Sequence, residues 1–389
     1  MNWNNPAERR ALRDQWTLRP DVHYLNHGSF GPAPRCVVDA RRDWFQRLQS
    51  DPVDFLTRQA EPALEEARCR LGHFVGTSGD DLVFVDNATM AMNIVAANTP
   101  LAPGDEVLIN DHEYGAVLRI WERKCARCRA RLVVQPIPWP VHSSEEVVEA
   151  IMAGASPRTR LLVFSHVTSA TAIVMPAEAI CRRARGLGIP VCVDGPHAVA
   201  MIPLDIAGLD CDYYTASCHK WLSAPFGAGF LYVHPRHQGR IEPIVTSWGT
   251  PPDRPHRWND EFTWAGTRDP SAFLAVPAAI DFLESLGLAE FREHTHALAQ
   301  RARQRIGALT GLDPVVPDSR QWYGSMIALP LPDGEAPALQ CALWERYAIE
   351  IPVIAWHGRR LIRPSCHLYT QPEELEQLAE ALTRLLWRP

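Results

Sequence analysis

Short apolar runs alternate along this chain with longer stretches in which apolar positions recur every three or four residues. The runs have the length of β-strands and end in small or polar residues; they occupy residues 81–85, 106–109, 131–134, 160–164, 189–193, 213–216 and 229–233. The stretches between them have the period of amphipathic helices; they occupy residues 90–97, 115–128, 144–153 and 176–188. This alternation predicts an α/β fold with a mostly parallel sheet that helices cover on both faces.

The two ends of the chain have a different pattern. Helical periodicity precedes the alternation at residues 6–17, 36–49 and 57–75. After residue 270 long helical faces return, and strands are expected at residues 325–329, 349–353 and 360–365. Thr370 and Glu373 have the spacing of a capping box before a last helix. We therefore expect an N-terminal helical segment (1–20), a large domain (21–265) and a smaller C-terminal α+β domain (266–389).

The composition is that of an ordinary globular protein. Of 389 residues, 46% are hydrophobic and 22% are charged, and the length allows two domains. The net charge of −6 and the isoelectric point near 6.2 argue against a nucleic-acid partner or an anionic membrane partner. The first ten residues lack the apolar core of a signal peptide, and no apolar run approaches the ~20 residues of a membrane span. We expect a soluble, cytoplasmic protein.

Ten cysteines are scattered through the chain, mostly in apolar runs or helical stretches, as buried free thiols are. Cys125 and Cys128 form the only close pair. A second close cysteine pair is missing, and the flanking residues are basic and helical. Zinc binding and redox chemistry are therefore not expected at this pair.

Polar residues gather where the predicted strands end. Asp194 closes the run that begins at residue 189, and Lys220 lies between the run 213–216 and a glycine-rich segment. The carboxyl ends of parallel strands face one crevice, so these two side chains should meet there. Pyridoxal phosphate (PLP) needs a lysine for a Schiff base and an aspartate for its ring nitrogen, so the pair suits that cofactor. Other polar residues expected at this edge are Thr89, His112, Tyr114, His166, His197 and His219.

Each of these residues also has a purely structural interpretation. Single histidines are often structural, and metal binding is not expected because no His-x-His or His-x-x-x-His spacing occurs among them. Ala88 and Thr89, after Asn87, open a helix whose N-terminus could hold a phosphate, although a simple N-cap has the same sequence. Arg363 at a strand end could bind a carboxylate or form a surface ion pair.

Taken in order, these motifs resemble those of class V aminotransferase-like enzymes, which are PLP-dependent enzymes of fold type I. The motifs are Tyr24–Gly31, Asn87–Thr89, Asp194–Ala198, Ser217–Trp221, Gly266–Thr267 and Arg363–Ser365. The resemblance covers nearly the whole chain and is greatest to the isopenicillin N epimerase-like branch. It implies a large PLP-binding domain with a mostly parallel sheet of the seven-stranded type, and a smaller C-terminal α+β domain.

The resemblance also implies roles for individual residues around the cofactor ring. Lys220 would be the Schiff-base lysine and the main base at Cα, Asp194 would pair with the ring nitrogen, and His197 would lie near the phenolic oxygen. His166 is expected among the cofactor-binding residues. The ring stacked on the cofactor would be Tyr114 or His112, and the local sequence favours Tyr114.

Further implied contacts concern the phosphate and the substrate. Ala88, Thr89, Ser217 and His219 would hold the phosphate. Thr267 would reach the phosphate of a neighbouring subunit, which implies a homodimer with shared active sites. Arg363 would bind the substrate carboxylate, and His27 and Gly28, in a sharply turning loop, are further candidates for substrate binding.

Two residues depart from the pattern or invite another interpretation. Pro196 replaces the small residue of the usual Asp-Gly-Ala-His sequence. Cys366 lies three residues after Arg363, but cysteine desulfurases carry their nucleophilic cysteine at another spacing and in another motif. A structural role is therefore favoured for Cys366, since a reactive thiol would also need a lowered pKa.

The residues specify the first proton transfer better than the complete reaction. Lys220 would remove the Cα proton, with Asp194 supporting the cofactor ring. Epimerisation would then need a second acid, for which Tyr114, His27 and His112 are candidates. Our hypothesis is an epimerase-like or carbon–sulfur lyase-like enzyme acting on an amino-acid substrate. Alternatives are an aminotransferase, a PLP enzyme of specialised metabolism, and a cofactor-free binding homologue, against which the presence of both Lys220 and Asp194 argues.

Overall fold

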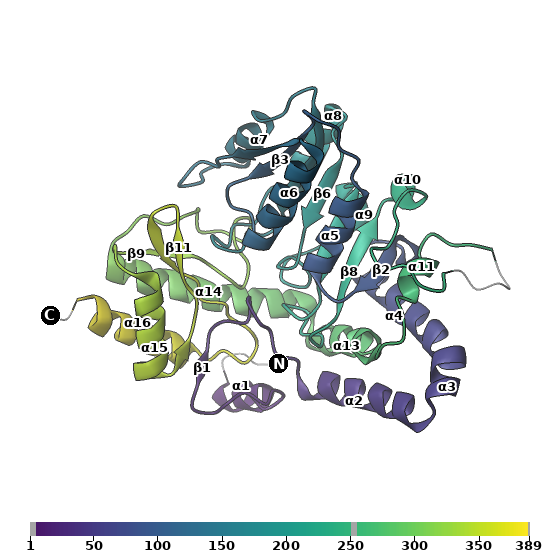
Figure 1. The fold of residues 1–389 in the computed structure, drawn as a ribbon. Helices are drawn as coiled ribbons and strands as arrows, with labels where there is room; N and C mark the ends of the chain where they lie inside the picture. The colour runs from purple at the N-terminus through teal and green to yellow at the C-terminus, as the bar shows by residue number, and fades with distance from the viewer. Residues whose placement is uncertain (1–4, 250–254, 388–389) are drawn as a thin grey trace.

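A seven-stranded sheet runs through the centre of the molecule in this computed structural model, which describes residues 5–249 and 255–387 (Figure 1). The strand order is β2-β8-β7-β6-β5-β3-β4. All neighbouring strands are parallel except β8, which is antiparallel to β2 and β7. The strands are β2 (Leu82–Val85), β3 (Glu106–Asn110), β4 (Arg131–Gln135), β5 (Thr159–Ser165), β6 (Val191–Asp194), β7 (Tyr213–Ser217) and β8 (Gly229–Val233). The predicted α/β fold with a mostly parallel sheet is confirmed.

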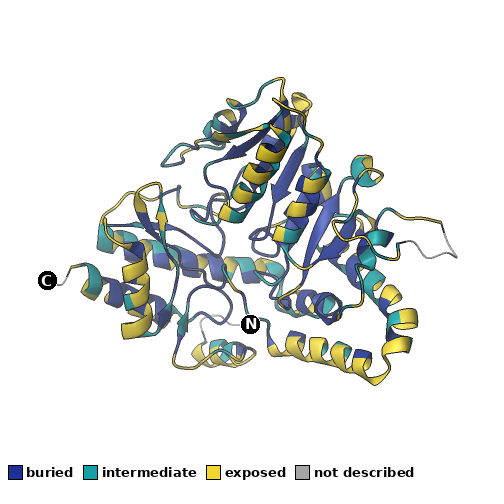
Figure 2. Ribbon diagram, viewed as in Figure 1, coloured by how far each residue is buried: buried dark blue, intermediate teal, exposed yellow. Residues whose placement is uncertain are grey.

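Helices cover both faces of this sheet. On one face, α5 (Ala88–Asn98) and α6 (Gly115–Cys128) pack around Val107, Val163 and Leu231. On the other face, α7 (Ser144–Met152) and α8 (Ala177–Gly186) pack around Leu162 and Phe164. Figure 2 shows the strands buried and the outer sides of α5 and α6 exposed, as their amphipathic sequences require.

Other helical segments flank the sheet. Figure 1 shows α2, α4 and α13 side by side below it, and α13 packs against both α2 and α4. The helical segments before residue 287 that are not yet named are α1 (Pro6–Arg13), α2 (Arg35–Ser50), α3 (Pro52–Asp54), a π-helical turn (Phe55–Gln59), α4 (Ala60–Phe74), a 3-10 turn (Gly79–Asp81), α9 (Ile206–Leu209), α10 (Pro235–Gln238), α11 (Asp260–Thr263), α12 (Ser271–Leu274) and α13 (Val276–Leu286).

The C-terminal part forms a second layer around a three-stranded antiparallel sheet in the order β11-β12-β9. Its elements are α14 (Leu288–Thr310), β9 (Leu329–Leu331), α15 (Ala336–Tyr347), β10 (Ile349–Glu350), β11 (Val353–Trp356), β12 (Arg359–Ile362) and α16 (Pro372–Leu386). The N-terminal strand β1 (His23–Tyr24) pairs in parallel with β10, so the start of the chain joins this layer. The domain boundaries at residues 20 and 265 remain predictions.

Three local expectations are corrected in this layer. The strand predicted at 325–329 is displaced to β9, because Met326 makes only a single bridge, to Ser365. The strand predicted at 349–353 divides into β10 and β11 at Pro352, which has no N–H for a ladder. The capping box uses Gln371 and Glu374. Thr370 and Glu373 do not form it, because the hydroxyl of Thr370 accepts a hydrogen bond from the His367 N–H.

No single helix in the described ranges is long and apolar enough to span a membrane. One bent pair, Ser271–Leu286 with Leu288–Thr310, passes that test on combined length and composition, with 79° between its two parts.

Strand register decides which side chains meet at the carboxyl edge of the sheet. Asp194 pairs with Ser165 of β5 and with Thr215 of β7, so these three side chains share one face. His166 is one residue further along the chain, and its ring instead meets Tyr214, which lies on the opposite face. The side chains of the neighbouring residues Ser165 and His166 therefore lie on opposite faces of the sheet.

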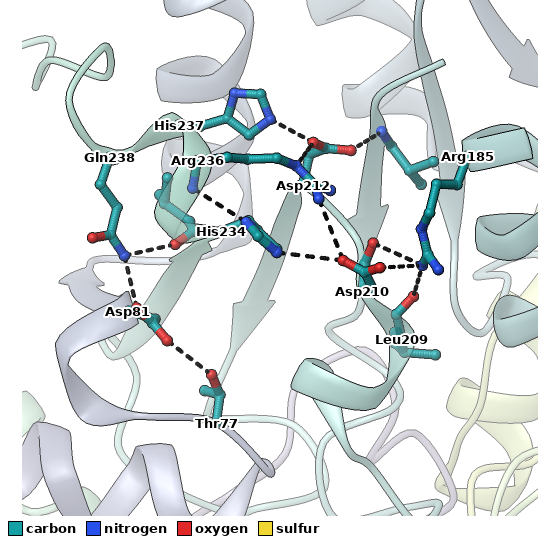
Figure 3. A network of polar contacts seen from close by, with 12 residues as sticks. Thr77, Asp81, Arg185, Leu209, Asp210, Asp212, His234, Arg236, His237 and Gln238 are labelled. Atoms are coloured by element: carbon teal, nitrogen blue, oxygen red, sulfur yellow. Dashed lines mark hydrogen bonds and ion pairs between the residues drawn. The ribbon is translucent and has the colours of Figure 1, made fainter. Parts of the chain in front are cut away.

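A dense ionic network closes the opposite, amino end of β7 (Figure 3). Asp212 accepts hydrogen bonds from Arg236 (2.8 Å), the Val191 N–H (2.7 Å) and His237. Asp210 pairs with Arg185 at 2.8 Å and with Arg236 at 3.4 Å, and His234 lies 3.3 Å from it. We call these residues the amino-end network. It ties α10, which follows β8, to α8 and to the turn before β7.

Candidate active site

Lys220 lies in the turn that follows β7, with its Nζ 2.9 Å from Nε2 of His197. The other ring nitrogen of His197 accepts a hydrogen bond from the indole N–H of Trp221 over 3.4 Å. Because an indole nitrogen can only donate, the neutral ring carries its proton on Nε2 and directs it at the Lys220 amine. Burial and the charge of Arg363 lower the pKa of Lys220 to about 7, against the opposing effect of Asp194. The arrangement therefore suits a neutral amine that can accept a proton.

Asp194 ends β6 and is buried at the same edge. Its Oδ1 accepts a 2.6 Å hydrogen bond from the hydroxyl of Thr215, which is its partner in the β6–β7 register. Burial raises the pKa of Asp194 to about 6, while the Thr215 hydrogen bond and Lys220 pull it down. The carboxylate would be stabilised by a cationic partner, such as a protonated ring nitrogen.

The N-terminus of α5 is close to the end of β7. The Ser217 hydroxyl accepts a 2.9 Å hydrogen bond from the Ala88 N–H, and the side chain of Asn87 accepts one from the Met90 N–H at 3.0 Å. The Thr89 N–H donates to no group in residues 5–249 and 255–387. Nearby in sequence, Nδ1 of His219 is buried without a partner in those same ranges. A free helix N–H and an unpaired imidazole nitrogen are what an anion requires.

Arg363 is buried where three distant segments meet. It donates to the Ser29 hydroxyl (2.7 Å), to the Ser169 hydroxyl (3.3 Å) and to the Ser169 carbonyl, all of which are uncharged. Its Nε has no partner, and no carboxylate among the described residues forms an ion pair with it. Burial lowers the pKa of Arg363 to about 10. A buried cation with only neutral neighbours is strongly stabilised when an anion binds beside it.

The two candidate stacking rings occupy different surroundings. Tyr114 is the N-cap of α6, is half-exposed, and lies near enough to Arg363 to act on it electrostatically. His112 is fully buried, with Nδ1 2.8 Å from the Thr171 hydroxyl and its ring 4.4 Å from that of Trp356. The structure thus leaves Tyr114, and not His112, accessible at the site. Which ring stacks on the cofactor remains a prediction.

Four of the expected site residues present no free group beside the Lys220 amine in this chain. His27 is buried with both ring nitrogens hydrogen-bonded, to Tyr369 and to the Lys220 carbonyl, so it has none left for a substrate. Gly28 is held by packing, because a Cβ there would lie 2.8 Å from Sδ of Met326. His166 bonds to the Tyr214 hydroxyl and faces a separate cavity of about 640 Å³, which is also lined by Met175 and Trp322. Thr267 is exposed and has no hydrogen bond within the part of the chain described.

One buried carboxyl group escaped the sequence analysis. Glu113 accepts hydrogen bonds from the N–H (2.8 Å) and the hydroxyl (2.6 Å) of Ser165. Burial, with a smaller contribution from the charge of Asp194, raises the pKa of Glu113 to about 7 against the opposing effect of the Ser165 hydrogen bonds. The available signal was its place between His112 and Tyr114, directly after a strand. Ser29, Ser169, Thr215 and Trp221 were also missed, because only the fold brings them to the site.

The chain contains only two lysines, Lys124 and Lys220. Lys124 lies on α6 with its Nζ 3.3 Å from the Ala97 carbonyl, in an exposed position. Lys220 is thus the only lysine amine at the carboxyl edge of the sheet.

The family model described as "Aminotransferase class-V" matches residues 23–378 of the chain. The protein belongs to the class V aminotransferase family. Within it, the chain is similar to isopenicillin N epimerase of Amycolatopsis lactamdurans, with 42% identity over 96% of this chain and 97% of the relative. It is 36% identical to isopenicillin N epimerase of Streptomyces clavuligerus, over 97% of this chain and 98% of that one.

Solved structures of the cystine C–S lyase C-DES have the same fold as this protein. One contains glycine covalently linked to PLP and matches with a TM-score of 0.81 at 24% identity, covering 95% of this chain and 98% of the other. Another contains cysteine persulfide and matches with a TM-score of 0.79 at 25% identity, covering 93% and 97%. The protein is a PLP-dependent enzyme of the epimerase-like or C–S lyase-like kind. The predicted family, fold type and cofactor are confirmed.

The residues present fit PLP. The lysine amine, the buried carboxylate of Asp194 and the free N–H of Thr89 supply one group for each of its aldehyde, ring nitrogen and phosphate. The unpaired Nδ1 of His219 offers a further polar atom near the Ser217 hydroxyl. The individual contacts to the cofactor remain predictions.

Proposed function

We propose that this enzyme inverts the configuration at Cα of an amino-acid group, and that isopenicillin N is the first substrate to test. The observation that carries the proposal is a buried Arg363 guanidinium with only neutral neighbours, in the same site as the Lys220 amine. The Arg363 guanidinium suits recognition of a carboxylate, and the Lys220 amine suits acceptance of a Cα proton. The identity to two isopenicillin N epimerases over nearly their full length supports this choice of reaction.

The geometry of the site supports the following residues for holding PLP. Lys220 would bind the aldehyde carbon and Asp194 would pair with the ring nitrogen, while His197 lies beside the lysine amine. Ala88, Thr89, Ser217 and His219 would hold the phosphate, together with Thr267 of the partner subunit. When bound, PLP supplies the electron sink for the negative charge that develops at Cα.

Proton transfer in this proposal uses two side chains. Lys220, neutral at its Nζ and oriented by His197, takes the proton from Cα. A second group then returns a proton from the other side of Cα. Among the candidates, His27 has no free nitrogen and His112 is fully buried, whereas Tyr114 is half-exposed beside Arg363. Tyr114 is therefore assigned as the second proton carrier, and Arg363 fixes the substrate carboxylate.

C–S bond cleavage is the second candidate, supported by the resemblance to C-DES. A mechanism that uses Cys366 as a sulfur acceptor is not favoured. The Cys366 thiol is completely buried, and burial raises its pKa far above the ordinary value.

We further propose a homodimer with shared active sites in the cytoplasm. Thr267 is exposed and forms no hydrogen bond with the residues that the structure describes, and α2 and the segment after it expose Val38, Phe45 and Val53. Sedimentation should show a dimer. Mixing a Lys220→Ala subunit with a Thr267→Ala subunit should restore activity above that of either variant, and no restoration would contradict the shared site. Fractionation of the producing cells tests the location.

The reaction is tested with PLP-loaded enzyme, isopenicillin N and amino acids in deuterated water. Deuterium at Cα together with inverted configuration is the expected result. Release of sulfide or of a keto acid without inversion would replace the proposal with the lyase candidate. Lys124→Ala is the matched control and should retain wild-type activity, because Lys124 is exposed on α6.

A further inference from the structure

The loop that contains His27 reaches the main chain of Lys220. Nε2 of His27 lies 2.9 Å from the Lys220 carbonyl oxygen, and Nδ1 lies 2.8 Å from the Tyr369 hydroxyl. Because a carbonyl only accepts, Nε2 must carry the proton. Nδ1 is then the acceptor, and the Tyr369 hydroxyl donates to it. Two hydrogen bonds thus define one tautomer of His27.

The His27 ring is held between other rings. The ring of His367 is stacked on it, with centroids 3.8 Å apart and planes at 13°, and the ring of Trp221 lies 5.2 Å away at 38°. The loop itself must approach closely, since a Cβ on Gly31 would lie 2.5 Å from the His219 carbonyl oxygen and 2.6 Å from Nε2 of His27. The ring therefore cannot rotate away from Lys220 without displacing its neighbours.

The main chain that His27 contacts is a strained turn. The Lys220 carbonyl also accepts a 2.8 Å hydrogen bond from the N–H of Ser223, whose φ of +57° is unfavourable for a residue with a side chain. Such a turn persists only when surrounding contacts hold it. His27 provides one of those contacts from a segment almost two hundred residues earlier in the chain.

The other end of this chain of hydrogen bonds is also fixed. Arg13 of α1 donates to the Tyr369 carbonyl at 2.8 Å and pairs with Glu374 of α16 at 3.2 Å. Tyr369 is completely buried. A continuous path thus leads from the C-terminal layer through Tyr369 and His27 to the backbone of the reactive lysine.

We propose that His27 is a positioning residue for Lys220, with Tyr369 setting its tautomer, and that the pair holds the lysine backbone so that Nζ stays beside His197. The inference rests on the proposed function, in which Lys220 is the reactive lysine. His27 and Tyr369 touch neither substrate nor cofactor in this role.

Two near-isosteric substitutions separate the two bonds of His27. The amide nitrogen of His27→Gln takes the place of Nε2 and can still donate to the Lys220 carbonyl. His27→Asn places its polar atoms at the Nδ1 position and cannot reach that carbonyl. Tyr369→Phe removes only the hydroxyl that sets the tautomer. The matched control is Tyr323→Phe, because Tyr323 is equally buried but its hydroxyl bonds to Asp318.

The primary readout is the attachment of PLP to Lys220, followed by visible absorbance, borohydride trapping and peptide mass spectrometry. Only one other lysine exists, so the modified peptide is unambiguous. Loss of one hydrogen bond should slow attachment roughly fivefold to tenfold in His27→Asn and Tyr369→Phe, with little change in His27→Gln and Tyr323→Phe. The kcat for Cα deuterium exchange should fall in the same order while KM stays within about twofold.

Equal behaviour of His27→Gln and His27→Asn, or an unaffected Tyr369→Phe, overturns the inference. If His27→Asn does not fold, Tyr369→Phe decides, since it removes one oxygen and leaves the ring packing. If the wild-type protein does not attach PLP at Lys220, the proposed function fails and the inference fails with it. If the wild-type protein attaches PLP at Lys220 and the variants attach it equally well, the inference fails and the proposed function stands.

Discussion

A buried aspartate lies at each edge of the sheet beside β7, Asp212 just before β7 and Asp194 at the end of the neighbouring strand β6, and the two carboxylates have opposite surroundings. At the amino end, burial would raise the pKa of Asp212, but hydrogen bonds from His237 and Arg236 outweigh it and the pKa is lowered. At the carboxyl end, Asp194 has one hydroxyl donor, and burial raises its pKa to about 6. The two opposite edges of the sheet therefore have one charge that the protein itself satisfies and one that is left for a ligand.

The same contrast holds for the cations. Arg236 and Arg185 at the amino end are paired with Asp210 and Asp212. At the carboxyl end, the charge of Arg363 helps to lower the pKa of Lys220, and the guanidinium of Arg363 has only neutral hydrogen-bond partners. Such destabilisation of charged groups is tolerated at active sites, because a bound anion relieves it. The paired charges of the amino-end network stabilise the fold, whereas the polar groups at the carboxyl end are available to bind a ligand.

The largest effect should come from removing the carboxyl-end amine. Lys220→Ala should reduce Cα deuterium exchange by more than roughly a thousandfold, since both the PLP attachment point and the general base are lost. Stopped assays with mass spectrometric detection of label measure this. Activity close to that of the wild type would show that the reactive group lies elsewhere.

The next largest effect should come from the unpaired guanidinium. Arg363→Gln removes the charge-assisted hydrogen bonds to a substrate carboxylate and should raise KM roughly 10- to 100-fold, with a smaller fall in kcat. Steady-state kinetics provide the measurement. Arg360→Gln is the control and should leave KM unchanged, because Arg360 lies on β12, three residues before Arg363, and bonds to the Pro332 and Asp333 carbonyls.

The comparison between the two ends is tested directly by the same substitution at both aspartates. Asp212→Asn should lower the free energy of unfolding by about 1–3 kcal/mol, because it removes a charge that His237 and Arg236 pair with. Asp194→Asn should not lower the free energy of unfolding of the PLP-free protein, yet it should weaken PLP binding. Urea unfolding and PLP titration give the two values, and a destabilised Asp194→Asn with intact PLP binding would remove the contrast.

The smallest effect concerns the pH dependence of stability at the two ends of β3. The pKa of Glu113 is raised to about 7, so its contribution to stability is present at low pH and is lost as the pH rises from about 4.5 to about 7. Glu113→Gln should flatten the stability profile over that window. Glu106 is buried at the other end of β3. The hydrogen bond from the Ser156 hydroxyl and the charge of Arg131 lower the pKa of Glu106. Glu106→Gln should instead remove stability at neutral pH and flatten the acid limb, as urea unfolding between pH 4 and pH 8 would show.

Much of the fold could be predicted because the sheet has a simple periodic signal. All seven of its strands were located from apolar runs, since parallel strands buried on both faces are almost continuously apolar. The C-terminal layer was predicted less well. Its strands are short and interrupted by prolines such as Pro352 and Pro364, so tertiary pairing decides where they begin and end.

The candidate site divides in the same way. Asp194 and Lys220 could be found because they lie where β6 and β7 end at one edge of the main sheet, and Arg363 because it directly follows a strand of the C-terminal layer. Glu113, Thr215 and Ser169 could not be singled out, because their importance depends on burial and register. His27 illustrates the limit, since its motif marked it as a site residue but only coordinates show that it bonds to the Lys220 backbone.

The shortage of lysine has a consequence for how an aldehyde finds its place on this protein. Almost all of the 39 basic residues are arginines, which do not condense with aldehydes as amines do. Of the two lysine amines, that of Lys124 lies against a carbonyl, whereas Lys220 has a pKa of about 7 and is substantially unprotonated at neutral pH. Among the side chains, a reactive aldehyde therefore finds one strongly nucleophilic amine, and this amine lies at the carboxyl edge of the sheet.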